Sequence, residues 1–156
     1  MKARAWGRRV QRGVVAVELA LLLPIALLLL PYLLFYGRVF WHYTAAQKIA
    51  HDTARYLSSV PVIEMKTSAR ATHAVAVAQA MAQAALAELR PGTGAFSPAV
   101  GISCSPLCSG AFVPATVRVE VDIIIYDDVF GGITSGIIGV DGLPLSAVVT
   151  MPYVGN

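Results

Sequence analysis

The feature that most constrains this chain is an uncharged, mostly apolar run of eighteen residues, 19–36. Eighteen such residues in a helix are about the fewest that can cross a hydrocarbon core roughly 30 Å thick. Extending the run to residues 14–37 gives twenty-four residues with one charge, that of Glu18. The sequence therefore predicts a single transmembrane helix over residues 14–37.

The basic residues are distributed unevenly around this span. Residues 1–13 contain five lysines and arginines and no acid, whereas residues 38–156 contain seven bases and eight acids. Because Lys and Arg are retained on the cytoplasmic side, we predict a basic cytoplasmic leader over residues 1–13. The part beyond the span is then periplasmic, in a single-pass protein of the bacterial inner membrane. A basic arm that binds nucleic acid is disfavoured, since an apolar span follows at once.

A cleaved secretory signal is the alternative explanation for a basic start and an apolar run. The run here exceeds the usual length of about 7–15 residues for such signals. No small-x-small cleavage site closes it directly, because Ala45-Ala46 lies several residues beyond Phe40-Trp41. An uncleaved anchor, or one trimmed on its cytoplasmic side, is favoured.

Glu18 lies near the cytoplasmic end of the span. A carboxylate costs about 2.5–3.5 kcal/mol at the bilayer centre and less near an edge, so such a residue indicates a function. Its position alone leaves two interpretations open. Glu18 contacts a charged group of a partner, or it sits at the interface beside Arg12 or lipid head groups.

The opening of the chain resembles the TadE/TadF-like proteins of tight-adherence (Tad/Flp) type IV pilus systems. The residues that carry the resemblance are Arg12, Gly13, Val17, Glu18, Ala20, Leu21 and the Leu-Leu-Leu-Pro run that ends at Pro24. Ala54-Arg55-Tyr56 extends the resemblance, which covers residues 8–58. Leu19 departs from the pattern, because the family usually has an aromatic residue there.

The resemblance implies that a prepilin peptidase cuts between Gly13 and Val14. Glu18, then the fifth residue of the mature chain, would contact the positive N-terminal amine of a neighbouring pilin or pseudopilin subunit. A subunit out of register would leave both charges unpaired, so the contact would set the register of assembly.

The predicted function is that of a minor pilin-like structural or assembly component that acts by subunit contacts. The implied partners are the membrane, other subunits, the prepilin peptidase and the inner-membrane assembly platform, with no nucleic acid and no cofactor. The alternative is a signal-anchored periplasmic binding or scaffolding protein unrelated to pili. Whether the protein is incorporated in the fibre, primes it or stays in the membrane is left open.

The helix is predicted to continue beyond the membrane. Apolar residues recur at helical spacing from Val39 to Leu57, which predicts a membrane-proximal helix within residues 38–60. Prolines inside the span predict kinks, at Pro24 and Pro31. An aromatic belt is expected where the helix leaves the lipid, formed by Phe40, Trp41 and Tyr43.

Residues 61–156 are predicted to form an α+β periplasmic domain with a second helix and a small antiparallel sheet. Ten alanines between Ala69 and Ala87 favour a helix over residues 64–89. Residues 116–126 alternate between apolar and polar, which is typical of a half-buried strand, and residues 145–153 predict a second strand antiparallel to it. Residues 91–114 are rich in Gly, Ser and Pro around the cysteines. Residues 129–140 are apolar and glycine-rich, and are interpreted as a short helix or as a loop on the membrane or another subunit.

Cys104 and Cys108 lie in the part predicted to be outside, where a disulfide persists. The three residues between them favour turns, so we interpret the pair as a small closed disulfide loop. A zinc site would need two further ligands, and the spacing is one residue longer than the redox Cys-x-x-Cys motif.

No catalytic motif is found. The three histidines have no metal-ligand spacing and are interpreted as surface or helix-packing residues: His42, His51 and His73. Residues 132–136 do not form a Gly-x-Ser-x-Gly motif. Asp127 and Asp128 are adjacent and would point to opposite faces of a strand, so they indicate a turn. The sequence predicts a protein that is not an enzyme.

Overall fold

The structure is a computed structural model that describes residues 11–90, 97–131, 134, 136, 139 and 142–155. Helices precede strands along the chain. The elements are α1 (Gln11–Ser58), α2 (Val62–Met65), α3 (Ser68–Leu89), β1 (Ala99–Ser105), β2 (Thr116–Ile125) and β3 (Leu143–Pro152). The predicted α+β class, with a long apolar N-terminal helix and a small antiparallel sheet, is confirmed.

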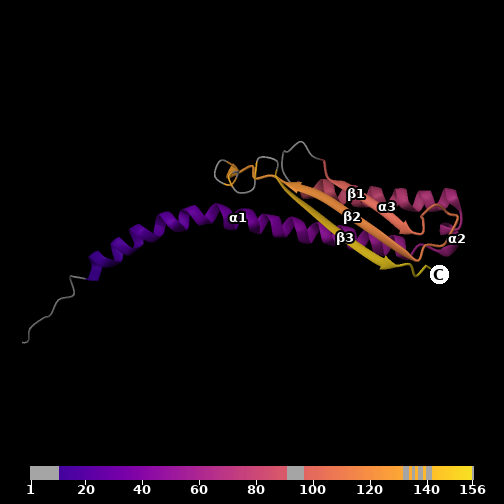
Figure 1. Cartoon of the computed structure of the whole chain (residues 1–156), viewed down its shortest axis with the longest axis horizontal. Helices are drawn as coiled ribbons and strands as arrows, with labels where there is room; N and C mark the ends of the chain where they lie inside the picture. Colours follow the sequence, from indigo (N-terminus) through magenta and orange to yellow (C-terminus); the bar gives the residue numbers. More distant parts are fainter. Residues whose placement is uncertain are drawn as a thin grey trace, which may run out of the picture.

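The helix α1 is continuous over 48 residues, or about 72 Å at roughly 1.5 Å per residue. Its first half projects away from the rest of the molecule, and its second half lies along the sheet (Figure 1). It ends at Ser58, inside the predicted range of residues 38–60. α1 remains helical through Pro24 and Pro31, where kinks are predicted, and its axis bends along the projecting part (Figure 1).

The second predicted helix is divided in two. Thr67 between α2 and α3 has an extended backbone (φ −111°, ψ 119°), and its carbonyl accepts the N–H of Ala71 at 2.8 Å to start a new helix. The end of α3 agrees with the prediction, because Arg90 takes the left-handed conformation (φ 43°) that terminates a helix.

The sheet has the order β1-β2-β3, and both strand pairs are antiparallel. The two predicted strands are confirmed as β2 and β3, each within two residues of its predicted bounds. The third strand, β1, was not predicted and falls in the Gly/Ser/Pro-rich segment of residues 91–114. In β1, Val100, Ile102 and Cys104 alternate with exposed small residues. Its composition does not favour a strand, and β1 becomes one by pairing with β2.

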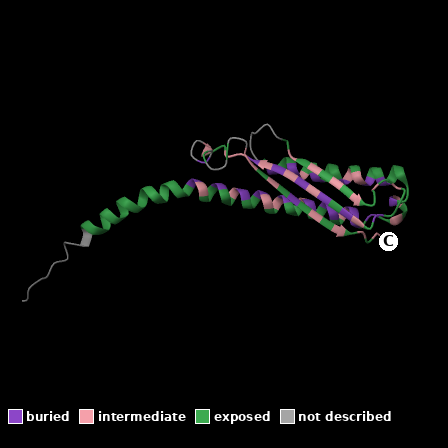
Figure 2. Cartoon of the chain, in the orientation of Figure 1, coloured by how far each residue is buried: buried purple, intermediate pink, exposed green. Residues whose placement is uncertain are grey.

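The core lies between the sheet and the two long helices. The predicted inner face of β2 is buried, with each residue at most 1% exposed: Val117, Val119, Val121, Ile123 and Ile125. Both helices contribute mainly alanines to this core, among them Ala50 and Ala54 of α1 and Ala78 of α3. These small side chains allow the helix backbones to approach the sheet closely. Figure 2 shows the contrast between this buried half and the exposed projecting half of α1.

Candidate functional site

Within the described part of the chain, one helix is long and apolar enough to cross a membrane, namely α1 from Gly13 onward. Every residue from 13 to 30 is exposed (Figure 2). Apolar side chains cover all sides of this segment; Leu21, for example, is 67% exposed. A helix that is apolar all round requires lipid or other helices to cover it. This arrangement suggests membrane anchoring.

Glu18 lies in this exposed segment, one helical turn after Val14 and therefore on the same face of α1. Its side chain is exposed, and no hydrogen bond or ion pair joins it to another residue that the structure describes. The side chain of Arg12, the alternative partner, lies outside the described residues.

Gly13 and Val14 lie in the first turn of α1. The first four N–H groups of a helix have no intrahelical partner, so this turn unwinds with the smallest loss of backbone hydrogen bonds. Among the described residues, apart from the neighbouring backbone of the helix itself, no atom lies within 4 Å of the position that a Cβ at Gly13 would take. Both residues are exposed.

Farther along α1, the outer end of the apolar segment contacts the connection between β2 and β3. The guanidinium of Arg38 donates a hydrogen bond from Nη1 to the carbonyl oxygen of Tyr126 at 3.3 Å. A cavity of about 360 Å³ separates the two segments, lined by Leu34, Phe35, Arg38, Asp127, Val129 and Phe130. Phe35 is only 3% exposed, although it lies inside the predicted transmembrane range. The outer domain therefore reaches the end of the predicted span.

Asp127 orders the connection at this place. Its Oδ1 accepts the N–H groups of Val129 at 3.1 Å and Phe130 at 2.9 Å, and its Oδ2 accepts the hydroxyl of Thr134 at 2.6 Å. Burial acts to raise the pKa of the Asp127 carboxyl, but these hydrogen bonds and the charge of Arg38 outweigh it and hold the pKa below its usual value. Asp127 stabilises a turn, as the sequence predicts.

The residues after Asp127 bear on the prediction of a short helix or loop over residues 129–140. Gly131, Thr134 and Gly136 are helical, and the N–H of Thr134 donates to the carbonyl of Phe130 at 3.0 Å. These positions agree with the short helix. Residues 132, 133, 135, 137, 138 and 140 lie outside the described residues.

His42 is 2% exposed and joins α1 to the end of α3. Its Nδ1 lies 2.8 Å from the carbonyl oxygen of Arg38, and its Nε2 lies 3.1 Å from that of Leu89. His42 is a packing residue, whereas His51 and His73 are exposed. Among the residues that the structure describes, no group of three or more His, Cys, Asp or Glu side chains comes together to hold a metal.

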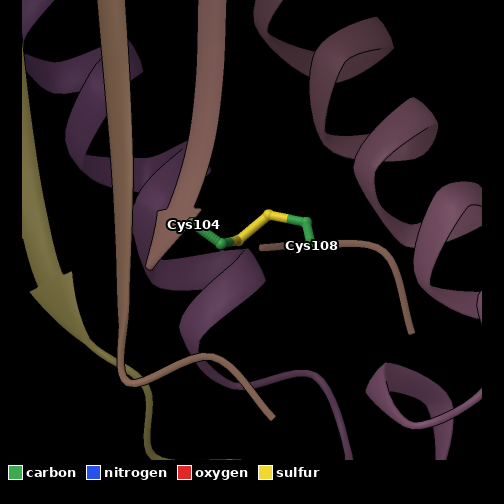
Figure 3. The surroundings of a disulfide bond; sticks show 2 residues. All are labelled: Cys104 and Cys108. Carbon is green, nitrogen blue, oxygen red and sulfur yellow. A yellow bond between two sulfur atoms is a disulfide. The ribbon is translucent and has the colours of Figure 1, made fainter. Parts of the chain in front are cut away.

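Cys104 and Cys108 are joined by a disulfide in the structure, with their Cα atoms 5.2 Å apart (Figure 3). Gly110 follows the closed loop with a left-handed backbone (φ 81°) and lies against Thr67 and Ser68. Any Cβ at Gly110 would collide with the backbone of these two residues. The loop that begins at the disulfide therefore returns to the start of α3.

Sequence reasoning missed the contacts of Phe35, Arg38 and His42. Arg38 is the first charged residue after the apolar run. This position beside the lipid indicates that its charge needs a partner. The partner, Tyr126, lies 88 residues away, and no local pattern identifies it.

Part of the chain matches a known protein family. Residues 13–55 match the family model described as TadE-like protein, which confirms the resemblance seen in the opening residues. The match begins at Gly13 and ends within α1, so the second long helix and the sheet lie beyond it. No curated protein and no solved structure matches the chain. The match supports a component associated with Tad pilus systems.

Proposed function

We propose that this chain, whose residues 13–55 are TadE-like, is a minor pilin-like component of a tight-adherence pilus system that acts through subunit contacts. One observation carries the proposal. The projecting part of α1 is exposed and apolar on all sides over residues 13–30, with Glu18 as its single charge. Such a surface is stable only when lipid or neighbouring helices cover it.

The distribution of charge supports one orientation of the anchor. The basic leader of residues 1–13 would be cytoplasmic, and the domain of residues 61–156 periplasmic, in a bacterial inner membrane. Residues 14–37 would span the bilayer, and residues 38–60 would link the span to the domain. The outer domain would offer surfaces to partners such as the assembly platform.

Removal of the leader would give Glu18 its partner. A prepilin peptidase that cuts between Gly13 and Val14 would create a positive amine at Val14. In lipid, an unpaired carboxylate or ammonium is costly, and pairing the two on neighbouring subunits offsets that cost. A subunit displaced along the helix axis would leave both charges unpaired. Glu18 would therefore select the register in which subunits assemble.

The test is complementation of a strain from which the gene has been deleted. Glu18→Leu should insert into the membrane at the normal level but give few or no pili, whereas Glu18→Asp should restore part of the assembly because it keeps the charge. Asp52→Leu is the matched control, since Asp52 is an exposed carboxylate on the same helix beyond the predicted span. Normal pili with Glu18→Leu would show that the register role is wrong. Normal pili in the deletion strain itself would favour the scaffolding alternative.

A further inference from the structure

An apolar surface continues from the projecting part of α1 onto the connection that follows β2. Leu34 and Phe35 line the same cavity as Val129 and Phe130. Leu34 and Val129 are apolar and exposed there, at 53% and 72%, and the exposed carboxylate Asp128 adjoins Val129 in the chain. The connection therefore lies beside the helix at the depth of Leu34 and Phe35.

The length of the span gives the depth of that position in a bilayer. A hydrocarbon core takes about 20 helical residues. If the hydrocarbon core begins at Val14, twenty residues of helix end at Leu33. If it begins at the charged Glu18, they end at Gly37. Leu34 lies between these limits, and so at the outer boundary of the hydrocarbon core.

The aromatic side chains of α1 give a second estimate. Phe40 and Trp41 are 66% and 59% exposed, and aromatic residues of this kind concentrate at the level of the head groups. Leu34 precedes Phe40 by six residues, or about 9 Å at roughly 1.5 Å per residue. Interfacial segments bury their apolar faces about 5–10 Å into the boundary between head groups and acyl chains. Both estimates place the connection in this layer.

Several polar groups in the described part of the connection are paired within the protein, which lowers the cost of placing it in this layer. The backbone N–H groups of Val129 and Phe130 donate to Asp127, and so does the hydroxyl of Thr134. Arg38 donates to the carbonyl of Tyr126. Val129 is thus exposed on a turn in which its own N–H and that of Phe130 are already bonded.

We propose that the connection after β2 inserts Val129 and Phe130 into the outer interfacial layer of the bilayer that α1 spans. The outer domain is then docked on the membrane at two places, α1 and this connection, and its orientation relative to the bilayer is fixed. The inference rests on the membrane anchoring in the proposed function, and the test below distinguishes a failure of the docking from a failure of the anchoring.

The test uses the full-length chain, one copy per nanodisc of phosphatidylcholine and phosphatidylglycerol. Single cysteines at Val129→Cys, Leu22→Cys and Val154→Cys are labelled with an environment-sensitive fluorophore without reductant, so that the Cys104–Cys108 disulfide stays closed. Leu22 reports on the anchor. Val154 is an exposed control, 64% exposed, whose N–H bonds to Ser58 at the far end of α1. Quenching by nitroxide-labelled lipids and by aqueous iodide is then measured.

The label at position 129 should be quenched several-fold more by the nitroxide lipids, and several-fold less by iodide, than the label at position 154. If the label at position 129 behaves like that at 154 while the label at position 22 is quenched by lipid, the docking is wrong and the anchoring stands. If the label at position 22 also escapes the lipid quencher, the anchoring itself fails. Protection from iodide without quenching by lipid would mean that protein covers Val129, and would equally overturn the proposal.

Discussion

The guanidinium of Arg38 donates a hydrogen bond to the carbonyl oxygen of Tyr126 at 3.3 Å, between residues 88 positions apart in the chain. The bond joins the outer end of the apolar segment of α1 to the residue that follows β2. Asp127, the next residue, orders the turn that carries Val129 and Phe130. The helix and the domain are therefore held together at the place where α1 would leave the lipid.

Arg38→Gln should loosen this junction, because the shorter, uncharged side chain does not reach Tyr126. The loss of one hydrogen bond should cost about 1 kcal/mol, or about fivefold in the local opening equilibrium. Amide hydrogen exchange of Val129 and Phe130 should accelerate by that factor, with β2 unchanged. Arg55→Gln is the control, an exposed arginine on the same helix. Equal exchange rates in the two variants would contradict the contact.

The turn at Asp127 should lose stability in acid. Its carboxyl has a lowered pKa in the folded protein, so its contribution is present above the unfolded value of about 4. That contribution is lost as the pH falls through the folded-state pKa. The protection factor of the Phe130 amide, taken relative to an unstructured peptide at each pH, should therefore fall below pH about 4. Asp127→Asn should show low protection that does not change over this range. A parallel acid response in Asp127→Asn would mean that another group is responsible.

Two adjacent isoleucines on β2 should differ greatly in their effect on stability. Ile123 is 1% exposed in the core, whereas Ile124 is half-buried on the opposite face of the sheet. Ile123→Ala should lower the free energy of unfolding of the outer domain by about 3 kcal/mol through lost burial and a residual cavity. Ile124→Ala should cost less than half as much. Pulse proteolysis in urea measures both, and equal losses would contradict the assignment of the inner face.

The disulfide should stabilise the outer domain by closing a small loop in the unfolded chain. Cys104 and Cys108 are four residues apart, and closing so short a loop is worth about 2 kcal/mol by chain entropy. The double variant Cys104→Ser/Cys108→Ser should therefore have a lower Tm than the oxidised protein. Reductant should lower the Tm of the natural protein to the same value and leave the variant unchanged. If reductant does not change the Tm of the natural protein, the stabilising role is contradicted.

The parts of the fold that sequence could predict depend on local periodicity. The apolar run predicts the projecting part of α1, and strict alternation identifies the inner face of β2, from Val117 to Ile125. The parts that sequence missed depend on partners distant in the chain. β1 is rich in glycine and serine and becomes a strand through its pairing with β2. The break at Thr67 separates α2 from α3 within a stretch that composition alone favours as one helix.

The candidate site divides in the same way. Gly13, Val14 and Glu18 are predicted from a short motif beside an apolar run, and their roles remain predictions. Arg38 and Phe35 were not, because their surroundings come from the connection after β2. Nothing within the span marks Phe35 as a residue that the domain covers.

The intact mass of the protein purified from native membranes tests most directly the claim that α1 is the subunit-contact element. The expected mass lacks residues 1–13, which makes Val14 the first residue and supplies the amine that Glu18 of a neighbour would contact. One closed disulfide between Cys104 and Cys108 removes a further mass of about 2 Da. A mass that retains all of residues 1–13 would contradict the claim, because no free amine would then exist at Val14.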